Sequence, residues 1–398
     1  MKRTRAVIAS LLPLLLLTSC SAPESSHCVL DPEQMPQSWR PSGTVQQVLV
    51  AETWSGSESA EAAFSVRRGI EEMVDLYEQN PKAAEDLWED SVASLIEVTY
   101  ASANTAQVDE MARDGARENL TGLVQPFLTR DPGTAQCSDY GSVLPLVLHA
   151  HNQYESNDAR VGHMVDLANA ALAQCNSLST AMELDYEPML ASGEASLGDA
   201  FDLVIWTLLL IEAQVVPGLD VPPEARDLPA RAWGFFQDYP LPGAAEFPDG
   251  ATDGTFIETA YLATHIAYIP TGNHRFPIYV EDAPHVYDFH RENFYPVLQM
   301  GELDLVAEFV DSLRQYGCTA ENDLQVRDGT RYLLDVFHAG GDRWMTYREP
   351  GETAADIDDY DLVHKAWTAV LGVREREIES PGPGTYGGVV RGWLPAPE

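Results

Sequence analysis

The chain has little positive charge. Its 398 residues include 62 Asp and Glu but only 24 Lys and Arg, which gives a formal net charge of −38. Lysine is nearly absent, because it occurs only at Lys2, Lys82 and Lys365. Phosphate binding needs clustered cations, so we expect no nucleic-acid partner. An anionic membrane surface would also repel the body of the protein. We interpret the acidity mainly as a solubilising surface.

Several sequence signatures of catalysis are missing as well. The chain has no Walker A motif, no GxSxG nucleophile elbow, no SxxK motif and no HExxH motif. These absences argue against nucleotide-driven chemistry and against α/β-hydrolase chemistry, and no cofactor is favoured. The most apolar run after the N-terminus, LVIWTLLLI at 203–211, is shorter than the roughly 20 residues that a membrane-spanning helix needs. We expect it to form a fully buried core helix.

The first twenty residues carry an export signal. Three basic residues precede a short apolar run at 6–17, and the sequence LTSC follows, ending at Cys20. This pattern resembles the lipobox of bacterial lipoproteins. The resemblance implies a signal peptide over 1–19 and acyl chains such as palmitate on Cys20, which would be the protein's contact with a membrane. It also implies a place in the bacterial cell envelope. The residue after the cysteine is Ser21, which in a Gram-negative cell would favour the outer membrane. The alternative is an ordinary signal peptide cleaved near Ala22.

Four cysteines remain after the lipobox: Cys28, Cys137, Cys175 and Cys318. An even number in an exported protein predicts two disulfides, and three connectivities are open. The spacings contain no CxxC, which argues against a thiol metal site. A bridge from Cys28 would fix the start of the chain to the body.

Helical periodicity runs through most of the chain. Residues 20–55 are rich in Ser, Pro and Gln and are predicted to form a lipidated tether. One all-helical domain is predicted over 56–379, followed by a C-terminal tail at 380–398. The helices in antiparallel pairs predict an all-α fold arranged as a toroid-like ring or a curved solenoid, with two stacked bundles as the alternative. Caps, prolines and apolar spacing predict helices at 57–80, 81–96, 106–128, 138–154, 158–175, 197–214, 223–237, 254–269, 286–300, 302–316, 324–339 and 360–376.

Histidine is concentrated at 256–295, which holds four of the ten in the chain. In the helix predicted there, four residues are spaced by three, four and three positions and share one face: Glu258, Tyr261, His265 and Tyr268. Such a polar face is unusual for a helix packed in a core, so we predict that it lines a catalytic cleft. His265 would be the acid or base, a tyrosine its proton partner, and Glu258 the orienting group. The alternative is a solvent-facing stripe.

Two further groups are predicted to bind the substrate. The loop after this helix carries His274 beside Arg275, a pair suited to a carboxylate, sulfate or phosphate oxygen. In the last predicted helix, Asp361 and His364 are three residues apart and are expected to hydrogen-bond. Trp367 follows on the same helix and would offer a stacking surface for a sugar. The alternative for His274 and Arg275 is a plain surface turn, and for the second group it is an exposed Asp–His pair beside a core tryptophan.

The histidines also raise the question of a metal site. His285 and His290 are five residues apart, which is not the HxxxH spacing that places two ligands on one helical face. A metal would need another ligand from a different helix. We therefore keep His285 and His290 only as weak metal candidates.

Together these observations favour a lipid-anchored, exported helical enzyme. It would be an acid–base hydrolase or lyase acting on an extracellular or periplasmic substrate such as a glycan. Two alternatives are open: a non-catalytic envelope lipoprotein that binds a small molecule, a glycan or a partner protein, and a metal-binding protein that uses the histidine cluster. The enzyme hypothesis requires His265 and His274 to converge in one concave pocket.

Overall fold

The structure is a computed structural model that describes residues 27–41, 53–100, 105–154, 158–274, 276, 278–349, 352–353 and 357–375. Over these ranges the chain is all-helical, with fifteen α-helices and no strand. This confirms the all-α prediction. The predicted signal peptide, Cys20 and the predicted tail at 380–398 lie outside the described residues.

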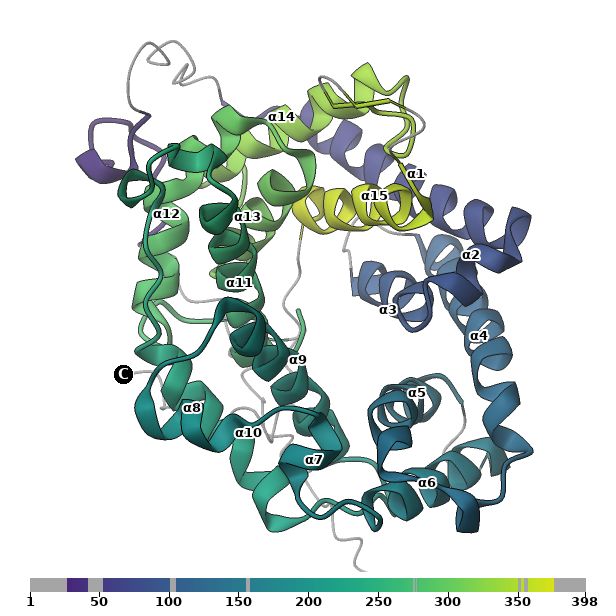
Figure 1. Cartoon of the computed structure of the whole chain (residues 1–398). Helices are drawn as coiled ribbons and strands as arrows, with labels where there is room; N and C mark the ends of the chain where they lie inside the picture. The colour runs from purple at the N-terminus through teal and green to yellow at the C-terminus, as the bar shows by residue number, and fades with distance from the viewer. Residues whose placement is uncertain are drawn as a thin grey trace, which may run out of the picture.

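The fifteen helices follow one another along a single packed body (Figure 1). Their bounds are α1 (Gly56–Gln79), α2 (Pro81–Asp86), α3 (Asp90–Glu97), α4 (Ala106–Leu128), α5 (Tyr140–Gln153), α6 (Ala159–Leu172), α7 (Leu178–Met182), α8 (Tyr186–Ser192), α9 (Leu197–Ala213), α10 (Pro223–Gln237), α11 (Gly254–Thr271), α12 (Pro284–Met300), α13 (Leu303–Gln315), α14 (Leu324–Ala339) and α15 (Asp359–Val373).

The structure departs from the predicted helices in two places. The helix predicted at 81–96 is divided into α2 and α3 around Trp88, whose φ of 52° lies in the left-handed region. No glycine or proline marks this break, so it could not be predicted from local residue types. The short helices α7 and α8 were not predicted, because five or seven residues are too few to show a helical period.

The last helix of the fold packs against the first. α15 lies along both α1 and α13, and α13 also packs on α11 and α14 (Figure 1). Another set of contacts joins α9 to α5, α10 and α11. Segments far apart in the sequence therefore meet around a shared interior.

α13 is the central helix of this body. Every one of its residues except Asp304 is buried. α15 approaches it very closely at Gly372, where a Cβ atom would lie 2.7 Å from the carbonyl oxygen of Ala307. Three buried charged residues on α13 are Glu308, Asp311 and Arg314. Charges in such a position need partners, and these partners define the site described below.

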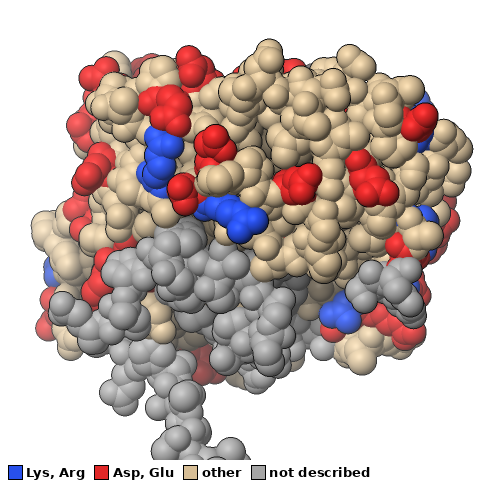
Figure 2. Space-filling model, turned by 90° about the horizontal axis from the view of Figure 1, so that it is seen from below, with Lys and Arg blue, Asp and Glu red and all other residues tan. Residues whose placement is uncertain are grey.

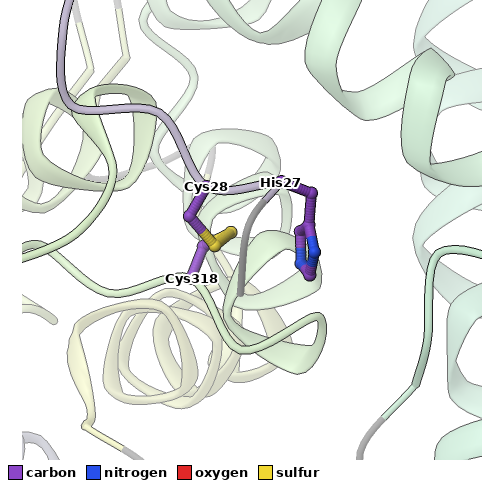
Figure 3. Close-up of side chains that lie close together, drawn as sticks. All are labelled: His27, Cys28 and Cys318. Atoms are coloured by element: carbon purple, nitrogen blue, oxygen red, sulfur yellow. A yellow bond between two sulfur atoms is a disulfide. The ribbon is translucent and has the colours of Figure 1, made fainter. Parts of the chain in front are cut away.

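Two disulfides are present, Cys28–Cys318 and Cys137–Cys175, which confirms the prediction and settles the connectivity. Figure 3 shows the first bridge with His27 beside it. His27 Nε2 lies 2.8 Å from the carbonyl oxygen of Tyr316. These contacts fix residues 27 and 28 to the body, although the sequence placed them within a tether.

Acidic side chains are spread over the face seen in Figure 2, where Lys and Arg are far fewer. This distribution agrees with a solubilising role for the negative charge. Among the helices of the described ranges, none combines the length and the apolar character that a membrane crossing requires.

Candidate functional site

Six helices line a cavity of about 920 Å³: α3, α5, α9, α11, α13 and α15. Apolar side chains of α5 and α9, among them Leu148, Phe201 and Leu208, form one part of its wall. Carboxylates dominate elsewhere, because eleven of the lining residues are Asp or Glu. Lys365 is the one Lys or Arg among the described residues that line it. The cavity thus combines an apolar wall with a strongly acidic one.

The apolar wall corrects one expectation from the sequence. The run at 203–211 was expected to be a fully buried core helix, but it forms the middle of α9 and is buried on one face only. Ile205, Leu208 and Leu209 on its other face line the cavity. Apolar periodicity cannot distinguish a helix buried in a core from one that lines an internal cavity.

The two histidines required by the enzyme hypothesis line this same cavity. Tyr268 lies between them, with ring centroids 5.0 Å from His265 and 4.3 Å from His274. Tyr261 also lines the cavity, as does Glu258, which is exposed. The predicted polar face of α11 therefore faces a concave pocket rather than bulk solvent alone.

The imidazole of His265 is held in one tautomer. Its Nδ1 lies 2.8 Å from the carbonyl oxygen of Tyr261, one helical turn earlier. A carbonyl only accepts hydrogen bonds, so Nδ1 carries the proton and Nε2 has the free electron pair. Burial lowers the pKa of His265 to about 4. The ring is therefore neutral at pH 7 and has the form of a base.

Two acids of α13 and one histidine of α15 form a compact cluster next to His265. The donor atoms of Asp304, Glu308 and His364 all lie within 4.8 Å of one another. His364 Nδ1 is 3.1 Å from Asp304 Oδ2. Glu308 Oε2 accepts a hydrogen bond from Thr264 and lies 3.9 Å from His265 Nδ1. We call Asp304, Glu308, His364 and His265 the central cluster.

The central cluster holds its members in different protonation states. Burial, together with the charge of Asp304, raises the pKa of Glu308 to about 8. Burial alone would also raise the pKa of Asp304, but the charge and hydrogen bond of His364 outweigh it and hold this pKa below its usual range. Burial would lower the pKa of His364, and Asp304 instead raises it to about 9. At pH 7, Glu308 is therefore protonated, Asp304 is ionised and His364 is charged.

The sequence prediction missed Asp304 and Glu308, which lie on a helix that reads as an ordinary amphipathic segment. A signal was present, because Asp304, Glu308 and Asp311 are spaced by four and three residues. That spacing puts three acids on one face of the helix. Buried acids aligned in this way require partners, and each acid of this face lies near a histidine from elsewhere in the chain: His364 on α15, His265 on α11 and His274 in the loop after α11.

The two tyrosines of the polar face of α11 are close to carboxylates. The hydroxyl of Tyr261 is 2.8 Å from Asp304 Oδ2 and 3.0 Å from Glu302 Oε1. Burial and these carboxylates raise the pKa of Tyr261 far above its ordinary value. Burial also raises the pKa of Tyr268. Both phenols keep their protons at neutral pH, so they suit positioning better than proton exchange.

His274 is held in a buried ion-pair network. It follows the left-handed residues Gly272 and Asn273, which end α11, and its own φ is 69°. Its Nε2 lies 2.8 Å from Asp311 Oδ2, and Asp311 Oδ1 lies 3.3 Å from Arg374. With 4 % of its surface exposed, His274 is placed as a supporting group rather than as an anion-binding one. Arg275 lies outside the described residues.

On α15, His364 is paired with Asp304 rather than with Asp361, its expected partner. The side chain of Asp361 instead accepts a hydrogen bond from the backbone N–H of Asp358 in a capping box. Trp367 lines the cavity, and its indole N–H donates to Glu97 over 3.0 Å. Trp367 is therefore one of the aromatic side chains of the cavity lining.

The weak metal candidates lie away from the cavity lining. His290 is fully buried, packs against Phe309 with the two rings tilted, and has its Nδ1 2.7 Å from the carbonyl oxygen of Val286. His285 is half-buried in the first turn of α12. In the described ranges, one group whose ligand atoms lie close together is instead Asp304, Glu308 and His364. A second group combines His27 with Cys28 and Cys318, whose sulfur atoms are bonded to each other.

Comparison of the chain with protein-family models, curated proteins and solved structures finds no match in any of the three. The function therefore has to be argued from the cavity itself.

Proposed function

We propose that the cavity is the active site of an acid–base hydrolase or lyase that acts on an extracellular or periplasmic substrate such as a glycan. One observation carries the proposal. A protonated carboxyl, Glu308, and a neutral imidazole, His265, lie side by side with Oε2 and Nδ1 3.9 Å apart. Pairs of titratable groups whose environments push their pKa values apart are the usual source of an acid and a base in one site.

In hydrolysis, His265 is the general base and Glu308 the general acid. Tyr261 holds the Nδ1 proton of His265, so Nε2 takes a proton from a water molecule. The water oxygen bonds to the substrate carbon. The bond from that carbon to the leaving oxygen breaks as Glu308 gives this oxygen its proton. Exchange of protons with solvent then restores both groups.

In a lyase, the same base removes a C–H proton and the same acid protonates the leaving oxygen, which leaves a double bond.

Asp304 and His364 position this pair and set its charge. Ionised Asp304 keeps Glu308 protonated, because two carboxylates this close resist joint ionisation. Charged His364 neutralises Asp304 across their 3.1 Å contact. The hydroxyl of Tyr261 holds Asp304 from the other side. These contacts fix the acid before a substrate arrives, which lowers the reorganisation needed during the reaction.

The walls of the cavity fit a neutral sugar chain. Aromatic rings such as Trp367 and Tyr360 offer flat apolar faces, and carboxylates accept hydrogen bonds from hydroxyl groups. The acidic wall disfavours an anionic glycan. This differs from the sequence-based expectation that His274 and Arg275 would hold an anionic group.

We further propose that the protein is anchored in the cell envelope through acyl chains on Cys20. The lipobox resemblance supports this, and the two disulfides are typical of exported proteins. We also propose that the helix pairs form a curved, toroid-like array around the cavity. The packing of α15 on α1 and the spread of the lining residues from α3 to α15 support that arrangement.

The test is a screen of the purified full chain in detergent against soluble neutral glycans. Products are detected as new reducing ends for hydrolysis and by ultraviolet absorbance of an unsaturated product for lysis. Glu308→Gln preserves size but removes the transferable proton, and we expect it to lower the rate by roughly 10²–10⁴-fold. Glu118→Gln, an exposed change on α4, is the control. An active wild type with an equally active Glu308→Gln variant would contradict the proposal. Thermal stabilisation by a glycan without any product would favour the non-catalytic binding alternative.

A second candidate function is supported by the donor group of the central cluster. Two carboxylates and one imidazole within 4.8 Å suit a divalent ion such as zinc, manganese or iron. Such an ion would require Glu308 to be ionised and would replace it as the acid. Metal analysis after purification without chelator decides between the two. About one equivalent of metal, lost in an Asp304→Asn variant, would support the metal site.

A further inference from the structure

The cavity has an excess of negative charge that its own cations do not balance. Lys365 is already bound by both carboxylate oxygens of Glu352, each 2.6 Å from its Nζ. His364 is likewise committed to Asp304. On the side of the cavity formed by α3 and the start of α15, the lining includes three acids: Glu89, Asp90 and Asp361.

Among these acids, Glu89 gives the strongest indication of a missing ligand. It is the residue before α3, but its side chain makes no capping hydrogen bond. Its Oε2 is buried and has no hydrogen-bond partner within the described part of the chain. Burial, with the charge of Asp90, raises the pKa of Glu89 to about 7. A buried carboxylate oxygen without a partner costs free energy that a bound donor would recover.

A second observation concerns Glu308. It is 4 % exposed, and its Oε2 is the oxygen that contacts Thr264 and His265. Its Oε1 has no hydrogen-bond partner among the described residues, although the side chain lines the cavity. Two acids of the cavity, one from the loop before α3 and one from α13, therefore each keep an oxygen available to a ligand.

Tyr360 completes this side of the cavity. It is one of the few large exposed apolar side chains, with 43 % of its surface accessible. Its ring stacks on His364 at 4.9 Å and 19°, next to the central cluster. Tyr360 lines the same cavity as Glu89 and Asp90, and α15, which carries it, packs against α3. An aromatic face beside carboxylates is the combination that binds organic ammonium groups.

We propose that Glu89, Asp90 and Tyr360 form a subsite for an organic ammonium group, so that the ligand of this cavity is an amine. The ammonium subsite itself is argued from the residues that line the cavity. The inference rests on the proposed function at one point only, where it names an amino sugar as one source of the amine. A sugar carrying a free amine would place its ammonium at Glu89 and Asp90 and its apolar ring face on Tyr360. The reacting bond would then lie beside His364 and Glu308, because the Tyr360 ring stacks directly on His364. An aliphatic polyamine offers the same chemistry without the sugar.

The test measures binding by calorimetry with the full chain in detergent. The probes are a short glucosamine oligomer with free amines, its N-acetylated counterpart of equal length, and spermidine. We expect the free-amine oligomer to bind roughly tenfold more tightly than the acetylated one. Glu89→Gln should reduce binding of the amine by roughly tenfold while leaving the acetylated oligomer unchanged.

Two further variants keep the outcome interpretable. Tyr360→Leu alters an exposed position, so the fold tolerates it, and it should also weaken amine binding. Glu118→Gln replaces the same residue type at an exposed position outside the cavity lining, and it should leave binding unchanged. Tight binding of spermidine that is sensitive to Glu89→Gln supports the ammonium subsite and assigns an aliphatic source. Equal affinity for charged and neutral oligomers, or a Glu89→Gln variant that binds the amine normally, overturns it. The binding measurement does not depend on turnover. If Glu308→Gln proved to be as active as wild type, the proposed function would fail but the ammonium subsite would still be supported by the binding result.

Discussion

Replacement of Glu308 by glutamine should stabilise the protein at neutral and alkaline pH. The carboxyl of Glu308 has a folded-state pKa of about 8 against an ordinary value of 4.5. Below about pH 4, the group is protonated in both the folded and the unfolded state, so it contributes no pH dependence. Between the two pKa values, the unfolded chain releases the proton and the folded chain keeps it. The free energy of unfolding therefore falls as pH rises, and the full penalty is reached above pH 8.

The magnitude follows from the same values. At pH 7, the distance from the unfolded-state pKa is 7 − 4.5 = 2.5 pH units, which corresponds to a penalty of about 3 kcal/mol at 1.36 kcal/mol per unit. Glutamine carries no charge to bury and keeps an oxygen that can accept the Thr264 hydrogen bond. We therefore expect Glu308→Gln to raise the free energy of unfolding by about 2–3 kcal/mol at pH 7 and by almost nothing near pH 4.

The assay is urea denaturation at several pH values with both disulfides intact. Glu118→Gln on the exposed face of α4 serves as the matched control and should show no such trend. A Glu308→Gln variant that is less stable than wild type at pH 8 would refute the reasoning. So would a gain of equal size at pH 4 and pH 8, because the effect would then not come from ionisation of the carboxyl. A stabilised but inactive variant would be the usual sign that an active site is maintained at the expense of stability.

Three further predictions concern other parts of the molecule. Asp304→Asn should lower the pKa of His364 from about 9 to below its ordinary value, because less negative charge then opposes the lowering of this pKa by burial. NMR titration of the imidazole measures the pKa, and an unchanged value would rule out the pairing of His364 with Asp304. Gly372→Ala should destabilise the fold by about 1–3 kcal/mol, because the new Cβ would lie 2.7 Å from the Ala307 carbonyl oxygen; a thermal melt equal to wild type would show that α13 and α15 are not so close. Cys20→Ser should abolish incorporation of labelled palmitate and release the protein from the membrane fraction, and continued labelling would exclude acylation at that cysteine.

The sequence predicted the helical character of the fold well, because local signals were strong. The capping box of Ser55 and Glu58, for example, begins α1 close to the predicted start. The division of the helix predicted at 81–96 was not predictable, because a left-handed Trp88 has no local signature. In the fold, the Trp88 ring makes an edge-to-face contact with Phe127 of α4. Glu89 follows this break and lines the cavity. Because the break was not predicted, Glu89 was not recognised as a site residue.

The site was predicted in part. The polar face of α11 was found because steps of three and four residues are visible in the sequence. The partners of His265 and His274 were not found, since Glu308 and Asp311 lie on α13 and reach these histidines only through helix packing. Pairing across helices depends on how the elements dock, which one sequence does not reveal. Asp361 is the opposite case, in which a pairing predicted from local spacing did not form. Its spacing of three residues predicted a hydrogen bond to His364, but its carboxylate caps the start of α15 instead.

The central claim is that Glu308 acts as a protonated acid and His265 as a neutral base. The most direct measurement is the pH dependence of kcat/KM for the wild-type protein on a cleaved glycan, since it reports the pKa values of the essential acid and base in the free enzyme. The account predicts a plateau that begins above about pH 4, where His265 loses its proton, and ends near pH 8, where Glu308 ionises. A rate that keeps rising through pH 8 would contradict it, because the reaction would then require Glu308 in its ionised form.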